Sequence, residues 1–244
     1  MTAFFKLSNI LMGLMAAIVL TSHVSSSFAQ TAMPPRTQGY WPLNHLAAPG
    51  VASQWAGQTG KACPGDLQTV QVTGPAGMLI SFYDSMGREL KAASGVKVDV
   101  QVAAPYRMKI SEIPGYPGVE LYPTIELIDR LHPPAHLKHQ FPVPLTITEE
   151  DIDAALADDL VTKVIYIDQP EIAGTASTTE TLPAARNLLA EADMRGRPIM
   201  IFRMGRRQPD PRQPGTFFIS GGPVMPIEVT PNANTPNTAI QIEQ

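Results

Sequence analysis

Three histidines of this sequence gather in one short stretch that could carry chemistry. His132, His136 and His139 stand in HPPAHLKHQ, and Asp129 comes shortly before it. Imidazole nitrogens together with a carboxylate can bind zinc or copper, so a metal site or a metal-dependent hydrolase is one hypothesis. The two prolines after His132 oppose a helical pair of ligands, and no HExxH motif accompanies the histidines. We therefore favour a solvated loop and expect no cofactor.

Carboxylates suited to acid–base catalysis are present, but their spacing opposes pairing. Glu120 and Glu126 fall on one face of a predicted strand, about 20 Å apart at ~3.3 Å per residue. A glycosidase pair needs roughly 5–10 Å between its carboxyl groups. Asp151 and Asp153 point to different sides of a predicted helix. The sequence also lacks a G-x-S-x-G, P-loop or G-x-G-x-x-G motif, so no catalytic residue is predicted.

The first 29 residues have the pattern of a secretory signal peptide. Lys6 precedes the apolar run Ile10–Leu20, and Ser27 and Ala29 provide small residues at the −3 and −1 positions. The run is too short for an uncleaved anchor, since a spanning helix needs about 20 apolar residues. We predict cleavage after Ala29, an extracytoplasmic location (periplasmic, cell-surface or secreted) and no membrane span in the mature chain.

Length, net charge and cysteine content narrow the class of protein further. Removal of 29 residues from 244 would leave 215, enough for one large domain or two small ones. The formal net charge of −4 gives no basic surface for nucleic acid. Cys63 is the single cysteine, so no disulfide can form within the chain. We interpret it as incidental rather than as a reactive thiol or an intermolecular bridge.

Residues 30–61 are rich in proline, glycine, alanine and glutamine without clear periodicity. This composition predicts a flexible or loosely packed lead-in. Both tryptophans, Trp41 and Trp55, lie in it, and large rings of this kind usually bury against something. We expect them to dock on the folded body. The alternative is a partner surface, used for self-association or for another envelope protein.

Residues 62–130 alternate between apolar and polar side chains, as in VKVDVQV at 96–102 and YRMKIS at 106–111. Short strands every 8–12 residues with turns between them are typical of packed antiparallel sheets. We predict an immunoglobulin-like or transthyretin-like β-sandwich. Pro123 cannot donate a ladder hydrogen bond, so its segment is predicted to be an edge strand or to contain a break.

Two helices are predicted in the second half of the chain. Thr148 with Asp151 three residues later resembles a capping box and predicts a helix over about 149–158. Thr181, followed by Pro183, predicts the start of a second helix that Gly196 ends.

Strands are predicted around these helices, at 160–168 and at 198–204. Residues 131–225 thus form a mixed α and β segment, and whether they share one domain with residues 62–130 is left open. The tail, 226–244, is predicted to be disordered. The predicted fold class is α+β and β-rich.

Two stretches carry a resemblance to a family: YRMKISEIPGYPGVELYPTIELIDR at 106–130 and FPVPLTITEEDIDAALADDLVTKVIYI at 141–167. They resemble an uncharacterised family of secreted planctomycete-type proteins, over about residues 67–205. The most specific pieces are IPGxPGxELYPTIE and the TEED and VTKVIY segments. The resemblance implies an extracytoplasmic protein and carries over no activity, cofactor or site residue.

These observations together predict a secreted, non-catalytic structural or interaction protein of the cell envelope or exterior. Exposed sheet edges and proline-rich loops would be its contact surfaces. The alternative is a metal-binding protein or hydrolase that uses the loop of His132, His136 and His139.

Overall fold

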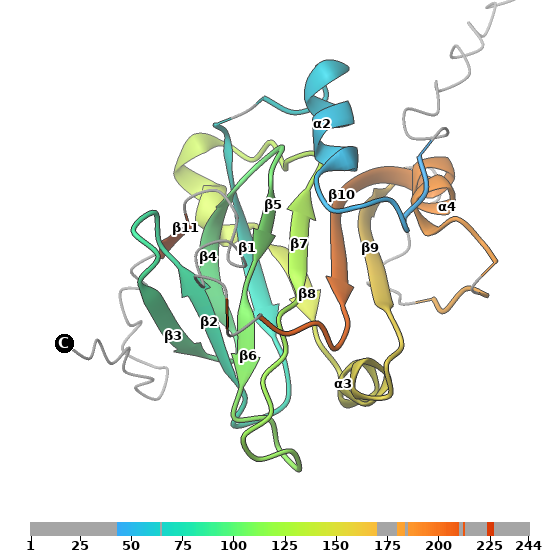
Figure 1. Ribbon diagram of the computed structural model, residues 1–244. Helices are drawn as coiled ribbons and strands as arrows, with labels where there is room; N and C mark the ends of the chain where they lie inside the picture. The colour runs from blue at the N-terminus through green and yellow to red at the C-terminus, as the bar shows by residue number, and fades with distance from the viewer. Residues whose placement is uncertain are drawn as a thin grey trace, which may run out of the picture. The chain divides into compact units, whose positions relative to one another are not determined.

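The described part of the chain is an α+β, β-rich fold in one compact unit (Figure 1). The computed structural model describes residues 43–63, 65–169, 180–183, 185–209, 212 and 224–226. The chain divides into two units, residues 1–37 and 38–244, and all of these residues lie in the second. The predicted signal peptide with its cleavage site at Ala29, Trp41 and residues 227–244 of the predicted tail lie outside the described residues.

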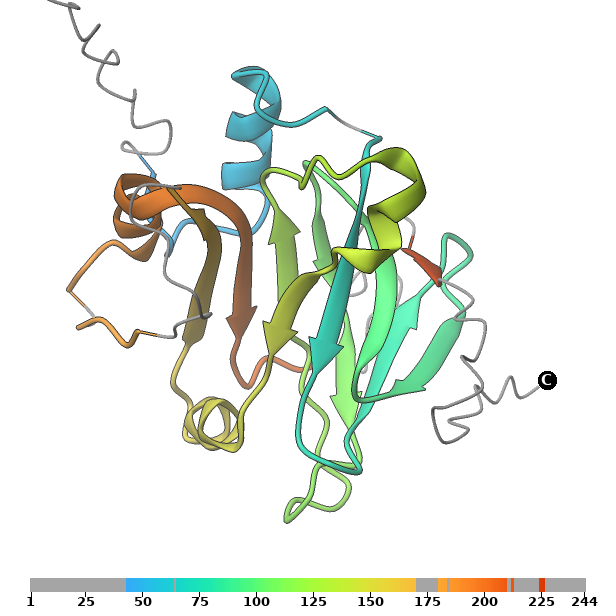
Figure 2. The same cartoon turned by 180° about the vertical axis from the view of Figure 1, so that it is seen from behind.

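The first sheet has four strands in the order β11-β4-β1-β8. They are β1 (Leu67–Thr73), β4 (Val96–Gln101), β8 (Val143–Thr146) and β11 (Val224–Pro226). The pair β1–β4 is antiparallel, as the alternation predicted, but β8 runs parallel to β1 (Figure 2). Strand β8 lies in the predicted mixed segment, outside residues 62–130 for which antiparallel sheets were predicted. The long connection from β1 to β8 permits the parallel pairing, because a distant crossover lets a strand return in the same direction.

The remaining strands form a three-stranded and a four-stranded sheet. The three-stranded sheet contains β3 (Glu89–Ala93), β2 (Leu79–Tyr83) and β6 (Lys109–Ser111), in that order. The four-stranded sheet contains β5 (Pro105–Arg107), β7 (Thr124–Leu127), β10 (Gly196–Met204) and β9 (Val161–Asp168).

Only Met108 separates β5 from β6, and backbone contacts continue across it. The Met108 amide donates to the Pro123 carbonyl over 3.0 Å, and Ile110 bridges to Leu121. We call the joined array β3-β2-β6/β5-β7-β10-β9 the long sheet. β7 begins directly after Pro123 and lies between two strands, so the predicted break occurs there and the strand is not an edge.

Strands from residues 62–130 and 131–225 share both sheets, since β1 pairs with β8 and β7 pairs with β10. One continuous core lies between the sheets. It includes Val70, Val72, Val98, Val100, Ile80, Phe82, Ile110, Ile125 and Leu127. Full burial of such a side chain contributes about 1.5–3 kcal/mol. The alternation of valine and isoleucine with polar residues predicted the strands. The same apolar side chains form the buried faces through which the two sheets pack together.

Helix α3 (Glu149–Leu156) confirms its predicted start. Thr148 accepts a hydrogen bond from the Asp151 amide, and the Asp151 carboxylate accepts one from the Thr148 amide over 2.7 Å. This reciprocal contact is the capping box expected from the sequence.

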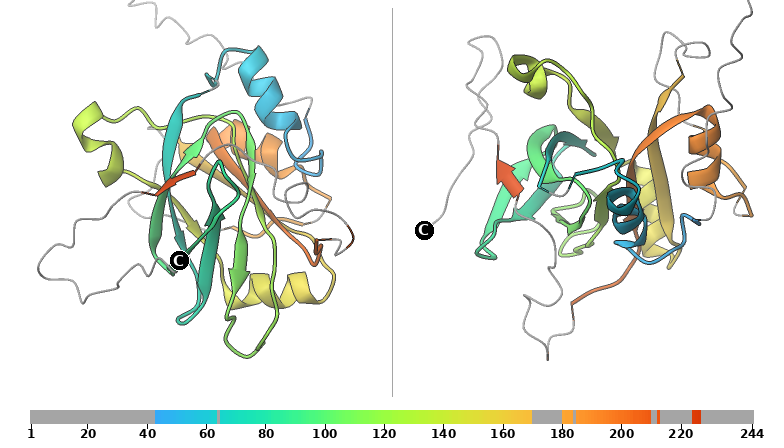
Figure 3. Two further views of the ribbon diagram at one scale, coloured as in Figure 1. Left: turned by 60° about the vertical axis from the view of Figure 1, so that its left-hand side comes forward. Right: turned by 90° about the horizontal axis from the view of Figure 1, so that it is seen from above.

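Helix α4 (Leu188–Arg195) lies against β9 and β10 (Figure 3). It ends before Gly196 as predicted, but its predicted start at Thr181 is wrong. Asn187 is the N-cap, because its side-chain oxygen accepts from the Leu189 and Ala190 amides. Its amide group also donates to the Leu43 carbonyl over 2.6 Å. A contact with a distant segment thus fixes the start of this helix.

Helix α2 (Val51–Gln58) lies within the predicted lead-in, which is therefore not loosely packed over these residues. Ala52 and Ala56 are buried in the main core, and Trp55 packs against it. The sequence signal was weak because the buried face consists of small residues. A 3₁₀ helix, η1 (Ala135–Gln140), leads into β8.

Candidate functional site

The predicted histidine loop is held against the first sheet. His139 Nδ1 lies 3.2 Å from the Thr69 hydroxyl of β1 and 3.8 Å from Asp99 Oδ1 of β4. The Thr69 hydroxyl donates to Asp99 over 2.6 Å, and Lys138 Nζ lies 3.3 Å from the other carboxylate oxygen. Thr69 is fully buried and donates to the carboxylate rather than to an imidazole, unlike an activated nucleophile. These contacts dock η1 on β1 and β4.

The other candidate metal ligands lie apart from this contact. Asp129 is buried, accepts from the Arg130 amide over 2.7 Å, and lies 3.3 Å from Arg197 Nη1. His132 and His136 are exposed. Among the residues that the structure describes, no three His, Cys, Asp or Glu side chains are grouped so that they could hold a metal ion. Cys63 is exposed and unbridged.

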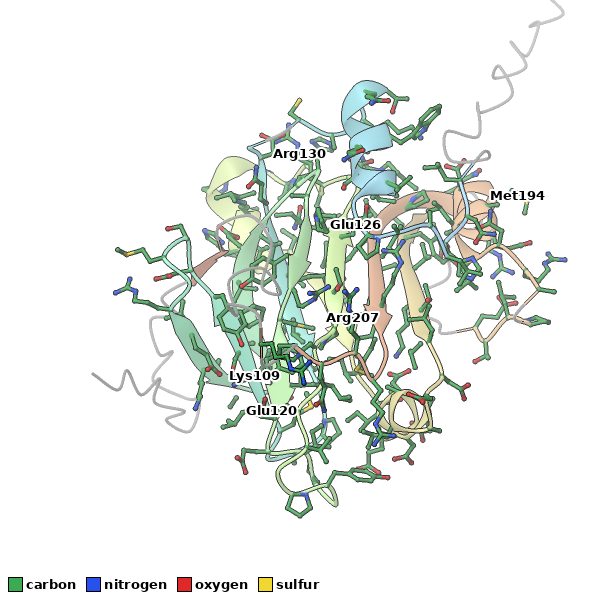
Figure 4. The ribbon with its side chains drawn as sticks, in the orientation of Figure 1. Lys109, Glu120, Glu126, Arg130, Met194 and Arg207 are labelled. Carbon is green, nitrogen blue, oxygen red and sulfur yellow. The ribbon has the colours of Figure 1, made fainter. Side chains whose placement is uncertain are left out.

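A cluster that the sequence did not indicate lies on the outer face of the long sheet. Lys109 Nζ of β6 is 2.7 Å from Glu89 Oε1 of β3 and 3.4 Å from Glu120 Oε1. The Tyr122 hydroxyl donates to Glu120 Oε2 over 2.6 Å. Figure 4 shows Lys109 and Glu120 close together. We call these four residues the Lys109 cluster.

The register of the strands explains how these residues meet. Lys109 pairs with Ser81 on β2, while its neighbour Ile110 pairs with Ile80 and faces the core. Alternate residues of a strand point to opposite faces, so Lys109 points outward. The alternation is visible in the sequence, but the pairing of β6 with β2 is not.

Burial, hydrogen bonds and charge shift the pKa values of Lys109, Glu89 and Tyr122. Burial, the largest single effect, would lower the pKa of Lys109, but the hydrogen bond to Glu89 and the negative charges of Glu89 and Glu120 together raise it. Burial, the largest single effect, would raise the pKa of Glu89, but hydrogen bonds from Lys109 and Ser81 and the charges of Lys109 and Lys91 together lower it. Burial raises the pKa of Tyr122, and its hydrogen bond to Glu120 raises it further. All three pKa values move away from neutrality, whereas a general acid or base needs one near the working pH.

A second network lies under α2 on the same face of the long sheet. Glu126 of β7 is fully buried, and its Oε2 lies 2.8 Å from Arg203 Nη1 of β10. Its Oε1 accepts from the Gly50 amide over 3.0 Å and from the Ser53 amide over 2.8 Å. Arg203 Nε donates to the His45 carbonyl over 3.1 Å. Figure 4 shows Glu126 beside the start of α2.

This network replaces a local cap at the start of α2. Gly50 is the N-cap residue, with a φ of 99° and no side chain to accept the first amides. The left-handed conformation favours glycine, so the sequence carries no Ser, Thr or Asp cap signal here. The distant Glu126 supplies the acceptor instead. Residues 43–58, which we call the docked segment, are thus held on β7 and β10 by buried polar contacts.

Strand β9 forms the last edge of the long sheet. It is eight residues long, pairs with β10 on one side, and has no described strand on the other. An edge strand directs half of its backbone N–H and C=O groups away from its neighbour. Ile167 near its end is 39% exposed, and Leu160 just before it is 56% exposed. The edge therefore offers backbone hydrogen bonds beside apolar side chains.

Comparisons with known proteins add no family to these observations. Neither a protein-family model, nor a curated protein, nor a solved structure matches the chain. The resemblance to the planctomycete-type family therefore stays a prediction. No helix in the described residues combines the length and apolar character needed to cross a membrane.

Proposed function

We propose that the chain is a secreted, non-catalytic interaction protein of the cell envelope or exterior that binds an extended segment of a partner along the β9 edge. The observation that carries this proposal is the edge itself. An extended peptide can add to such an edge through main-chain hydrogen bonds, and neighbouring side chains then select the sequence. Ile167 and Leu160 provide apolar contacts of this kind.

The charges and pKa values of the ionisable clusters support the proposal that the protein is non-catalytic. Lys109 is paired with the carboxylates of Glu89 and Glu120, and the pKa values of Lys109, Glu89 and Tyr122 are displaced from the range that proton transfer uses. Glu126 and Arg203 are committed to holding the docked segment. These groups stabilise the fold and its surface rather than a reacting substrate.

The proposal also includes the type of β-sandwich and the extracytoplasmic location. The common core between the two sheets supports a sandwich of the immunoglobulin-like or transthyretin-like kind. The apolar run before Ser27 and Ala29 supports export and cleavage. A partner in the envelope or outside the cell would meet the β9 edge there.

Site-specific crosslinking tests the proposal. A photoreactive phenylalanine analogue is placed at Ile167 on β9, and in a matched variant at Met86, which is 77% exposed in the β2–β3 turn. Irradiation in cells should give a discrete adduct from position 167 and none from position 86. Adducts from both positions, or from neither, would contradict an interaction at β9. Stoichiometric zinc or copper in the purified protein, lost in His132→Ala/His136→Ala, would favour the metal hypothesis instead.

A further inference from the structure

His45 connects the docked segment to the start of α4. Its ring Nδ1 lies 3.3 Å from the Leu188 amide nitrogen and 3.5 Å from Asn187 Oδ1. The His45 amide donates to the same Asn187 oxygen over 3.3 Å. The residue is 6% exposed, so water cannot easily replace these contacts. A backbone amide can only donate, and Nδ1 must therefore accept from Leu188, which requires a neutral ring.

The surroundings of His45 oppose a positive charge. Protonation would place an Nδ1–H opposite the Leu188 N–H, and the amino end of α4 carries a partial positive charge. Arg203 of β10 donates to the carbonyl of His45 itself.

Other charged groups near His45 are already engaged. Glu126 of β7 is paired with Arg203. On α4, Glu191 is paired with Arg186, and Asp193 is buried with an interaction of its own. None of the contacts of His45 described above is with a carboxylate.

We propose that protonation of His45 is a pH-sensitive switch that releases the docked segment from α4, β7 and β10. The inference stands independently of the proposed function, because it rests on contacts within the chain. Release would separate α2 from the core and free Glu126 and Arg203 from the backbone groups that they now bind.

The direction of the pH dependence follows from the contacts. Burial lowers the pKa of His45 from 6.5; the Asn187 hydrogen bond opposes this shift and the charge of Arg203 adds to it. A released His45 regains the ordinary value. Docking is therefore fully stable above a pH of about 6.5 and weakens as the pH falls toward the lower pKa of the docked state.

Hydrogen–deuterium exchange of the purified chain between pH 5 and 8 tests the switch. Exchange is corrected for the intrinsic effect of pH, and peptides covering 43–58 are compared with peptides covering β4. Protection of 43–58 should fall about tenfold for each unit by which docking lowers the pKa, while protection of β4 stays constant. Constant protection of 43–58 across this range would overturn the proposal.

A variant with an uncharged side chain at position 45 separates the effect of His45 titration from the effect of packing. His45→Asn places an amide oxygen about where Nδ1 lies, so it can accept from Leu188 at every pH. Its protection should not change with pH, whereas the control His139→Asn, at a half-exposed histidine, should respond like the wild type. A pH response retained in His45→Asn would refute the switch. If that variant does not fold, NMR titration of the wild-type histidines decides: a His45 pKa below 6.5 supports the switch, and a value at or above it refutes it.

Discussion

Replacement of Glu126 by glutamine should destabilise the protein strongly, although the side chain keeps its size. The change leaves Arg203, whose side chain is 7% exposed, without its carboxylate, and turns one acceptor into an amide that faces the guanidinium. Loss of one partner of a buried ion pair costs about 3–5 kcal/mol. Since a domain is stable by only about 5–15 kcal/mol, this loss removes a large share of the total.

Urea unfolding followed by circular dichroism at pH 7.5 measures this effect, with two comparisons. The double variant Glu126→Gln/Arg203→Met should recover part of the loss, because it no longer leaves a buried guanidinium charge without its carboxylate. Glu120→Gln is the exposed control and should cost less than about 1 kcal/mol, since its pair with Lys109 is half solvated. The reasoning fails if Glu126→Gln costs no more than Glu120→Gln, or if the double variant is as unstable as the single one.

Two further predictions concern the space around Gly196 and the charge of Lys109. Gly196→Ala should cost about 1–3 kcal/mol, because a Cβ there would lie 1.9 Å from the Ile167 carbonyl oxygen, whereas Gly57→Ala meets nothing within 4 Å and should be neutral or slightly stabilising. Urea unfolding of both variants checks this, and equal effects would show that the approach to Ile167 is not limiting. The raised pKa of Lys109 means that its pair with Glu89 stabilises the fold below pH 10.5 and is lost as the pH rises above that value. Urea midpoints should therefore fall more steeply at alkaline pH in the wild type than in Lys109→Met, and parallel curves would contradict the assignment.

Local signals predicted those parts of the fold that local contacts determine. Thr148 and Asp151 are three residues apart and together form the capping box of α3, so both of its residues could be recognised in the sequence. The alternating valines of β4 likewise predicted both the strand and its buried face. In each case the residues that decide the structure lie within one turn or one strand.

Elements that depend on distant partners could not be predicted in this way. The start of α4 at Asn187 is fixed by contact with Leu43, and the start of α2 by Glu126. The Lys109 cluster needs β3, β6 and the segment of Glu120 side by side, which follows from strand pairing alone. The sequence suggested Glu126 only as half of a catalytic pair, because its role as a cap depends on the position of β7 beneath α2.

The parallel pair of β1 and β8 has a consequence for folding. Val70 pairs with Val143, 73 positions later, so this edge of β1 is without its partner until most of the fold has been synthesised. Strand pairing between residues so far apart in the sequence forms slowly during folding. A strand edge that is still unpaired is prone to aggregation during that time. A newly made chain would therefore benefit from a chaperone that covers β1 until residues 143–146 arrive.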